Sequence, residues 1–408
     1  MNKNSVTTTL PAAVLSTMAL LASLSCSRQA RVVWQQQFSS DLSDVAVSVV
    51  TDSNDIIVGA NCRDTAYGKP DLWELLRYDA NGKLLWQKRY DRGTSDALAA
   101  VVVAADHDII AVGSTTPAAS GSRTKLLLAR FSPLGVPRWQ KEYDLGLDAI
   151  GTALAVDSSG RITVCGTIIP RTPHGGYDIL LAQFDSTGNV LRLDPLDFGA
   201  NEFGADMSRY HDRHATFTLA AGMRLPPPQA TDSLSNRDIV FFGIDAADSV
   251  LWREFYASGG EDARVRLAGL SAAVSSSAGI HVLSFGNRWC DWGILADTRY
   301  SEDSNATCVG LTADRGNHVL GVGTAGPKGH QYLMGWRYFR GRFLRFLPNE
   351  GYIPGPNDRA TDIALDAAGN AIVVGTSDSG RKSSVLVLKA ALPRYKPPPG
   401  IWLPNMYR

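Results

Sequence analysis

The sequence predicts an all-β fold in which a four-stranded antiparallel sheet is repeated seven times. Three observations predict it: β-branched runs recur at a fixed period, each period alternates strand and turn patterns, and a tryptophan position recurs at the same period. Since 375 − 59 = 316 residues cover six intervals, the mean period is about 53 residues, which is typical of stacked supersecondary units. The runs end at Gly59, Gly113, Gly166, Gly222, Gly286, Gly323 and Gly375.

Each period reads as four strands in an antiparallel meander. It begins with a run of small and apolar residues such as GTALAVD, then a turn such as DSSG, and then the glycine-ended run. A connection of variable length leads to a third run, such as DILLAQFD. Tight turns such as DANG and DSTG lead into the fourth run, because their glycine accommodates the positive φ of a hairpin.

Seven such sheets can hide their edges by packing radially into a β-propeller, in which each sheet is one blade. The fifth repeat departs from the pattern, because the glycine intervals on its two sides are 64 and 37 residues. We therefore expect an irregular fifth blade that is three-stranded or degraded.

A tryptophan recurs in the fourth run of several repeats. Trp86 and Trp139 are 139 − 86 = 53 residues apart, Leu191 takes the next equivalent position, and Trp252 takes the one after. This spacing favours packing between neighbouring blades over contact with a carbohydrate or quinone ligand.

The two ends of the chain are predicted to close the ring together. Trp34 precedes Asp44 by ten residues, just as Trp86 precedes Asp96, so residues 32–38 read as a fourth strand. We expect this strand to complete the last blade, whose other three strands come from near the C-terminus, at residues 359–392. The alternative is that the C-terminal run GIWLPNMYR supplies the closing strand, although its prolines disfavour a central ladder position.

The first 25 residues predict an export signal. An apolar run from Leu10 to Leu24 follows an early lysine, is short for a membrane span, and ends at small residues before Cys26. Leu24-Ser25-Cys26 resembles the lipobox of bacterial lipoproteins, which implies a lipid on Cys26; simple secretion and an uncleaved segment are the alternatives. Residues 26–31 would then be a short tether, residues 32–392 the propeller, and residues 393–408 a proline-rich tail.

The remaining cysteines are Cys62, Cys165, Cys290 and Cys308. In an oxidising compartment Cys290 and Cys308, which are 308 − 290 = 18 residues apart, could form a disulfide, and two unpaired thiols are the alternative. Cys165 lies in the run ITVCG and is expected to be a buried small side chain.

Motifs for catalysis or cofactor binding are weak. The 40 basic and 40 acidic residues leave no net charge, which disfavours nucleic acid as a partner. GVGTAG, residues 321–326, fits a dinucleotide-binding pattern but is followed by no helical periodicity, and His211 and His214 have no third metal ligand in view. We predict no catalytic residue, no metal ligand and no cofactor.

The run AVDSSGRITVCGT followed by DILLAQFDSTGNVL resembles the SBBP-type β-propeller repeats of bacteria, over roughly residues 34–392. DANGKLLW is also similar to the repeat of quinoprotein-like propellers, which include envelope lipoproteins that scaffold outer-membrane assembly. This chain lacks their tryptophan in every blade. Both resemblances imply a propeller, and neither implies a catalytic set at positions of this chain.

We expect an exported, lipid-anchored, monomeric propeller at the bacterial cell envelope, in the periplasm or at the outer membrane. It would bind an unknown protein or an envelope polymer without catalysis, and would contact the membrane only through its lipid. The alternatives are a propeller hydrolase or lyase acting on glycans or peptides, and a quinoprotein-like redox role. Converging carboxylates or histidines in the central channel would favour an enzyme.

The connections from second to third strand vary in length and should leave the ring on one face, where a rigid scaffold usually carries its recognition residues. From them and nearby positions we expect ligand contacts by Arg171, His174, Tyr177, Arg224, Arg288, Trp289, Trp292 and His330.

Overall fold

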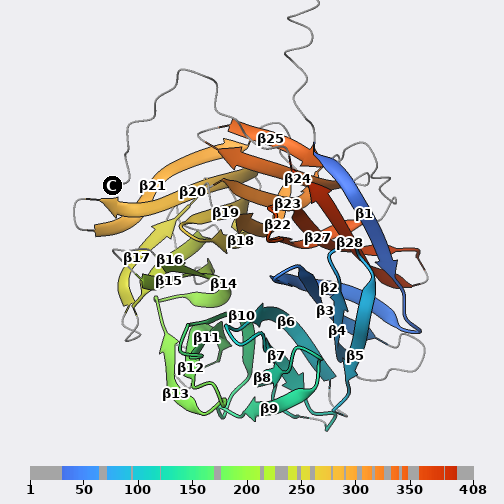
Figure 1. Ribbon diagram of the computed structural model, residues 1–408. Helices are drawn as coiled ribbons and strands as arrows, with labels where there is room; N and C mark the ends of the chain where they lie inside the picture. Colours follow the sequence, from blue (N-terminus) through green and yellow to red (C-terminus); the bar gives the residue numbers. More distant parts are fainter. Residues whose placement is uncertain are drawn as a thin grey trace, which may run out of the picture.

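The computed structural model confirms the predicted fold: seven four-stranded antiparallel sheets are arranged around a central axis (Figure 1). The described residues contain no helix long and apolar enough to cross a membrane. The structure describes residues 30–63, 71–92, 95–119, 121–169, 176–211, 216–225, 238–245, 250–257, 262–276, 279–288, 291–300, 306–314, 318–325, 332–339, 342–347, 358–380 and 382–392.

The first four blades follow one another along the chain. Blade 1 consists of β2 (Ser43–Asp52), β3 (Asp55–Arg63), β4 (Leu72–Tyr78) and β5 (Leu84–Tyr90). Blade 2 consists of β6 (Ser95–Val103), β7 (Ile109–Thr116), β8 (Lys125–Phe131) and β9 (Pro137–Tyr143). Blade 3 consists of β10 (Ala149–Val156), β11 (Ile162–Ile168), β12 (Asp178–Phe184) and β13 (Val190–Leu196). Blade 4 consists of β14 (Asn201–His211), β15 (Thr216–Leu225), β16 (Asp238–Ile244) and β17 (Val250–Tyr256).

The last three blades complete the ring. Blade 5 consists of β18 (Asp262–Ala268), β19 (Ser271–Ser276), β20 (Gly279–Arg288) and β21 (Asp291–Tyr300). Blade 6 consists of β22 (Thr307–Ala313), β23 (Val319–Ala325), β24 (Tyr332–Phe339) and β25 (Arg342–Leu347). Blade 7 consists of β26 (Arg359–Leu365), β27 (Ala371–Asp378) and β28 (Ser383–Ala391), and its outer strand is β1 (Arg31–Phe38).

The N-terminal strand closes the ring, as the register of the sequence predicts. β1 pairs antiparallel with β28, and this places Trp34 opposite Lys389 and Gln36 opposite Val387. Because β1 lies in the last blade and continues into the first, main-chain hydrogen bonds join the two ends of the propeller (Figure 1). The rival segment GIWLPNMYR lies outside the described residues.

Blade 5 corrects one detail of the prediction, because it has four full strands. The run IHVLSFG, expected to be a second strand, belongs to the third strand β20, and the second strand is the short β19. The irregularity lies in the connections, since only two residues separate β19 from β20 and only two separate β20 from β21. The connections between strands of blade 5 therefore differ in length from those of the other blades, but its sheet has the same four antiparallel strands.

The recurring tryptophans pack between blades, as predicted. Trp34 lies against Gly82 in the β4–β5 turn of blade 1, where a Cβ atom would come within 2.8 Å of the indole. The indole Nε1 of Trp34 also donates to the carbonyl of Ala80 at 3.1 Å. Trp86 lies against Gly135 and Trp139 against Gly188 in the same way, one blade further on each time. The next two positions differ: Leu191 is largely exposed, and Trp252 stacks on Phe285 of blade 5.

Every first strand, the inner strand of its blade, contains a β-bulge, and bulges bend a strand and redirect its side chains. Beside three of these bulges a polar side chain accepts a hydrogen bond from the main chain of the next blade: Ser48 from Val101, Asp206 from Leu267, and Asp362 from Val49. These bonds fix the inner edges of neighbouring blades to one another. The bulges interrupt pairing between Ala46 and Ser48, Leu98 and Ala100, Gly151 and Ala153, Gly204 and Asp206, Asp262 and Arg264, Cys308 and Gly310, and Ala360 and Asp362.

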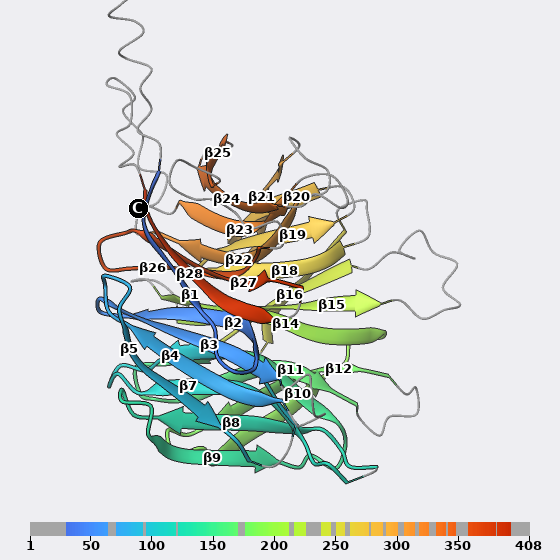
Figure 2. The same ribbon diagram turned by 90° about the vertical axis from the view of Figure 1, so that its right-hand side faces the viewer.

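The ring has two different faces, which we name by their connections. The loop face carries the connections from second to third and from fourth to first strands, and the turn face carries the tight first-to-second and third-to-fourth turns. β1 begins at Arg31 on the turn face and ends at Phe38 on the loop face (Figure 2). The chain therefore enters the propeller from the face opposite the variable connections.

Candidate functional site

Blade 1 departs from the repeat at one buried position, Glu74 on β4. The register of strand pairing identifies the equivalent position in other blades. In blade 1, Ala46 just before the bulge pairs with Ala60 on the second strand, and Ala60 in turn pairs with Glu74 on the third strand. In five other blades this position holds a buried apolar side chain: Leu127, Leu180, Val240, Met334 and Leu386. At this position five other blades bury an apolar side chain, whereas blade 1 buries a carboxylate. A buried carboxylate lowers stability unless a hydrogen bond or an opposite charge compensates it, so Glu74 marks a candidate site.

Two further buried groups lie beside Glu74. Asp44, at the start of β2, pairs across the hairpin with Cys62 near the end of β3. All three residues are 0% exposed. One carboxylate oxygen of Asp44, the Sγ atom of Cys62 and one carboxylate oxygen of Glu74 all lie within 4.8 Å of one another. Three strands of one blade thus bring a thiol and two carboxylates together.

Neighbouring side chains hold Glu74 by one oxygen only. Its Oε1 atom accepts hydrogen bonds from the Nε2 atom of Gln87 and, at 3.1 Å, from the Nε atom of Arg89. Its Oε2 atom is buried and has no hydrogen-bond partner in the structure. Arg89 also pairs with Asp41 at 2.7 Å. The outer strand β5 therefore orients Glu74 while leaving one oxygen available.

Asp44 is fixed by the connection that precedes its strand. Its Oδ2 atom accepts from the main-chain nitrogen of Ser40 at 2.8 Å, and its Oδ1 atom accepts from the Ser40 hydroxyl at 2.7 Å. This connection leads from β1 of blade 7 into blade 1. The position of Asp44 is thus coupled to the closure of the ring.

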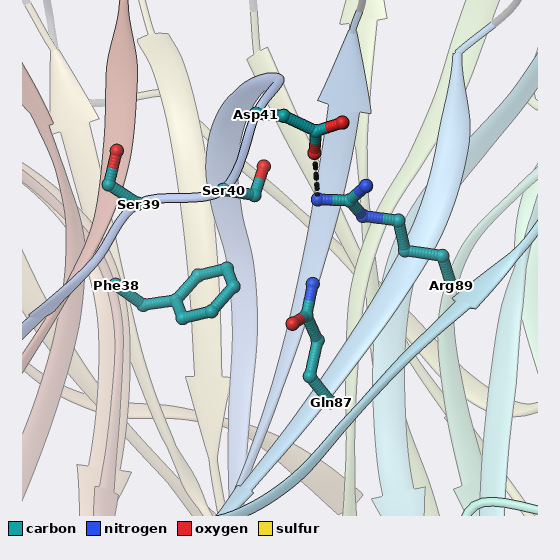
Figure 3. Close-up of a pocket in the computed structure, with 6 residues that line it drawn as sticks. All are labelled: Phe38, Ser39, Ser40, Asp41, Gln87 and Arg89. Atoms are coloured by element: carbon teal, nitrogen blue, oxygen red, sulfur yellow. Dashed lines mark ion pairs between the residues drawn. The ribbon is translucent and has the colours of Figure 1, made fainter.

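A pocket of about 490 Å³ lies beside this cluster on the loop face, between the end of β1 and the outer strand β5 (Figure 3). Figure 3 shows Arg89 reaching across to Asp41, with Gln87 beneath it. Because Gln87 and Arg89 also contact Glu74, the pocket wall adjoins the buried cluster. The pocket is lined by Phe38, Ser39, Ser40, Asp41, Gln87 and Arg89.

The surroundings of the cluster favour the protonated forms of Glu74 and Cys62 when no cation is bound. Burial raises the pKa of Glu74, and the negative charge of Asp44 raises it further. Burial also raises the pKa of the Cys62 thiol far above its usual range, with added contributions from Glu74 and Asp44. The thiol is therefore a poor nucleophile here, whereas the three groups together offer one soft and two hard ligand atoms.

Charged groups also lie on the inner, first strands of the blades. Burial raises the pKa of Asp362 to about 6, and Arg266 lies near enough to both Asp362 and Asp206 to oppose this effect at each. Each of these carboxylates accepts two main-chain N–H groups, one of them from the next blade. Arg266 donates from its Nε atom to the carbonyl of Val309 at 2.5 Å. These contacts indicate a structural role in joining blades.

A second acidic cluster lies between blades 3 and 4 and contains the predicted contact residue Arg224. Glu202 is fully buried, and its Oε1 atom lies 3.7 Å from the Nε atom of Arg224. The guanidinium of Arg224 also lies 5.5 Å from the ring centre of Phe255. Asp178 and Asp197 complete a group of three carboxylates with Glu202. This cluster offers carboxylate oxygens only, and Arg224 lies beside it as Arg89 lies beside the cluster in blade 1.

The other predicted contact residues are placed only in part. Tyr177 is exposed on the loop face, with its ring 4.7 Å from that of Phe203, so it is accessible to a ligand as expected. Arg288 ends β20 and Trp292 lies in β21, which places this hairpin between third and fourth strands, on the turn face. The expectation that it is a second-to-third connection on the loop face was wrong, because β19 takes the place of the second strand. Arg171, His174, Trp289 and His330 lie outside the described residues.

The predicted covalent sites are not tested directly. Cys26 and Cys290 lie outside the described residues, so lipidation and the disulfide stay predictions. Cys308 is a free, buried thiol near the loop-face end of β22, and its Sγ atom donates to the carbonyl of Gly310 at 3.3 Å.

Two sequence motifs take structural positions. Residues 321–325 of GVGTAG lie within β23, so this part of the motif is a strand and does not open a dinucleotide-binding helix. His211 ends β14, while His214 lies outside the described residues. Cys165 is fully buried as predicted, and burial raises its pKa to about 12.

Comparison with known proteins supports the fold and nothing finer. No family model matches the chain, and no curated protein matches it significantly. The chain is similar in structure to the Pan2 WD40 domain of Neurospora crassa, with a TM-score of 0.52, 10% identity, and coverage of 91% of this chain and 97% of that one. It is also similar to the α-L-arabinofuranosidase Arb93A of Fusarium graminearum, with a TM-score of 0.50, 5% identity, and coverage of 89% and 97%.

At these identities the likeness shows a β-propeller alone, so the resemblance to SBBP-type repeats stays a prediction. Asp44, Cys62 and Glu74 come from three strands and form no short motif, so the sequence does not reveal them as a group. One signal was available: the third run LWELLRY contains glutamate where KLLLARF and DILLAQF contain leucine.

Proposed function

We propose that this protein is exported, is anchored to the bacterial cell envelope by a lipid on Cys26, and binds a protein or envelope polymer there without catalysis. The observation that carries the proposal is the polarity of the ring. The chain enters at Arg31 on the turn face, whereas the connections of variable length leave the loop face (Figure 2). A lipid on Cys26 would hold the turn face near the membrane and leave the loop face directed toward a partner.

The tether supports this arrangement. β1 begins five positions after Cys26, so an extended tether spans at most about 18 Å. This is shorter than a typical membrane is thick, and it keeps the ring close to the lipid surface. Recognition would then fall to the loop face, where Tyr177 is exposed.

The anchor can be tested by fractionation of the full-length protein and of Cys26→Ser in a bacterial host fed an alkyne-labelled fatty acid. We expect the wild type in the membrane fraction with label, and the variant in the soluble periplasmic fraction without label. Equal labelling of both proteins, or no label on the wild type, would contradict the anchor.

The recognition face can be tested with a photo-crosslinking amino acid placed at one of two exposed positions. Tyr177 lies on the loop face, and Leu134, which is 70% exposed, lies in the β8–β9 turn on the turn face. We expect a discrete crosslinked product in cells from position 177 and none from position 134. Crosslinking only from position 134 would reverse the proposed orientation.

The alternative is an enzyme, a propeller hydrolase or lyase acting on glycans or peptides, and Asp362 is the observation that favours it. Although Asp362 also joins blades 7 and 1, a carboxyl at the inner edge of a blade with a pKa of about 6 is suited to proton transfer near neutral pH. A screen of glycans and peptides with the wild type and Asp362→Asn tests this candidate. Turnover that the variant abolishes would favour the enzyme over the binding module.

A further inference from the structure

The cluster in blade 1 has more negative charge than its neighbours balance whenever both of its carboxylates are ionised. Asp44 and Glu74 are both fully buried within 4.8 Å of a common thiol, and Arg89 is the cation paired with Glu74. Arg89 also neutralises Asp41, so it does not fully compensate both buried carboxylates. Burying charge without a partner is strongly unfavourable, so this arrangement calls for either protons or a further cation.

The second observation concerns the Oε2 atom of Glu74. It is buried and has no hydrogen-bond partner of ordinary geometry, whereas the other oxygen of the same carboxylate has two; the Cys62 thiol is the further group that interacts with this carboxylate. A buried acceptor left unsatisfied costs free energy, and native proteins rarely retain one without a reason. A metal ion bound at this oxygen would satisfy it.

The ligand atoms suit a borderline divalent cation. Zinc accepts thiolate sulfur at about 2.3 Å and carboxylate oxygen at about 2.0–2.2 Å in tetrahedral geometry, which places ligand atoms about 3.5 Å apart. The three atoms here lie within 4.8 Å of one another, so side-chain shifts of about 1 Å would bring them to that spacing. A thiolate among the ligands disfavours calcium and magnesium, which prefer oxygen alone.

The surroundings resemble the support that metal ligands normally have. Gln87 and Arg89 hold Glu74 by its Oε1 atom, and Ser40 holds both oxygens of Asp44. Such outer contacts fix the orientation of ligands before a metal arrives. The adjoining pocket of about 490 Å³ is separated from the three ligands by Gln87 and Arg89, which line it and contact Glu74, so a water serving as fourth ligand would have to pass between these side chains.

From these observations we propose that Asp44, Cys62 and Glu74 bind a zinc-class divalent cation. On binding, the Cys62 thiol loses its proton to solvent and its sulfur forms a bond to the metal, while one oxygen of each carboxylate completes the set of protein ligands. The site lies where blade 7 leads into blade 1, so the cation would stiffen the junction at which the ring closes. This inference does not depend on the lipid anchor or on the partner of the loop face.

The test uses the mature protein, reduced and freed of metal, with Co²⁺ as a spectroscopic probe and Zn²⁺ as its competitor. We expect one equivalent of Co²⁺ per chain, a near-ultraviolet charge-transfer band from thiolate to cobalt, and loss of this band when Zn²⁺ is added. Cys62→Ala should abolish the band. Cys165→Ala, which removes a buried thiol in blade 3, is the matched control and should retain it.

Two further variants separate ligation from folding. Glu74→Leu restores the residue type of the other blades, so it should fold, lose the cobalt band, and lose any rise in melting temperature with Zn²⁺. Gln87→Ala should retain the band but weaken Co²⁺ binding by about 10–100-fold, as expected for a group that orients a ligand. If the wild type shows no thiolate band, or if Cys62→Ala and Glu74→Leu bind Co²⁺ as tightly as the wild type, the proposal is wrong.

Discussion

Replacing Gly82 with alanine will destabilise the protein considerably more than the same change at Gly369. Both glycines have positive φ, +83° and +80°, and a left-handed backbone costs about 1–2 kcal/mol for a residue with a side chain. The two sites differ in what the new Cβ atom meets. At Gly82 it would lie 2.8 Å from the indole of Trp34, and at Gly369 it would meet nothing within 4 Å.

The difference in free energy comes from the tryptophan. The indole of Trp34 must move out of the space between blades 7 and 1, and overpacking of this kind costs a further ~1–3 kcal/mol. We therefore expect a loss of about 2–5 kcal/mol for Gly82→Ala and about 1–2 kcal/mol for Gly369→Ala. Gly135→Ala should match Gly82→Ala, because Trp86 occupies the same position there at 3.1 Å.

The measurement is the free energy of unfolding in urea, followed by tryptophan fluorescence, with variants compared at equal denaturant slopes. Limited proteolysis adds a local reading, since release of Trp34 should expose β1 to cleavage in Gly82→Ala but not in Gly369→Ala. Equal losses of stability at Gly82 and Gly369 would refute the idea that the tryptophan contact helps to close the ring.

Two other predictions follow from single contacts. Tyr90→Phe removes a hydroxyl that donates to the carbonyl of Gly135 at 2.7 Å in the interior, so unfolding in urea should show a loss of about 1 kcal/mol, and no loss would deny this bond between blades a role. Burial raises the pKa of Asp362 from 3.8 to about 6, so the folded protein holds this proton more tightly than the unfolded chain. The resulting stabilisation is complete below about pH 4 and is lost as the pH rises through about 6. The stability of the wild type relative to Asp362→Asn should thus fall by at most about 3 kcal/mol between about pH 4 and pH 7 in urea titrations, and a constant difference would contradict the raised pKa.

The architecture could be predicted because propeller repeats carry their register in the sequence. The equal spacing from Trp34 to Asp44 and from Trp86 to Asp96 was enough to place β1 in the last blade. Blade 5 was harder, because the glycine-ended run was used as the mark of a second strand. The second strand of blade 5 is the short run SAAVSS. It is rich in serine and alanine, which have low strand propensity, so its sequence does not indicate a strand.

The candidate site could not be predicted from local patterns. Asp44, Cys62 and Glu74 are separated by 18 and 12 residues, and they meet only because two successive hairpins align to within one residue. A slip of one residue in either hairpin would turn a side chain to the opposite face of the sheet. What the sequence does contain is the contrast between Glu74 and the leucines at the matching place in blades 2 and 3.

The pairing of β1 with β28 means that the ring can close only after both ends of the propeller are present. β1, the first strand of the described residues, pairs only with β28, so it has no strand partner until Ser383–Ala391 is present. A chain that lacks this segment retains the strands of blades 1 to 6 but leaves β1 without a pairing partner. A chain truncated before Ser383–Ala391 cannot pair β1 with β28, and we expect its unpaired strand edge to make it more sensitive to proteases than the complete chain.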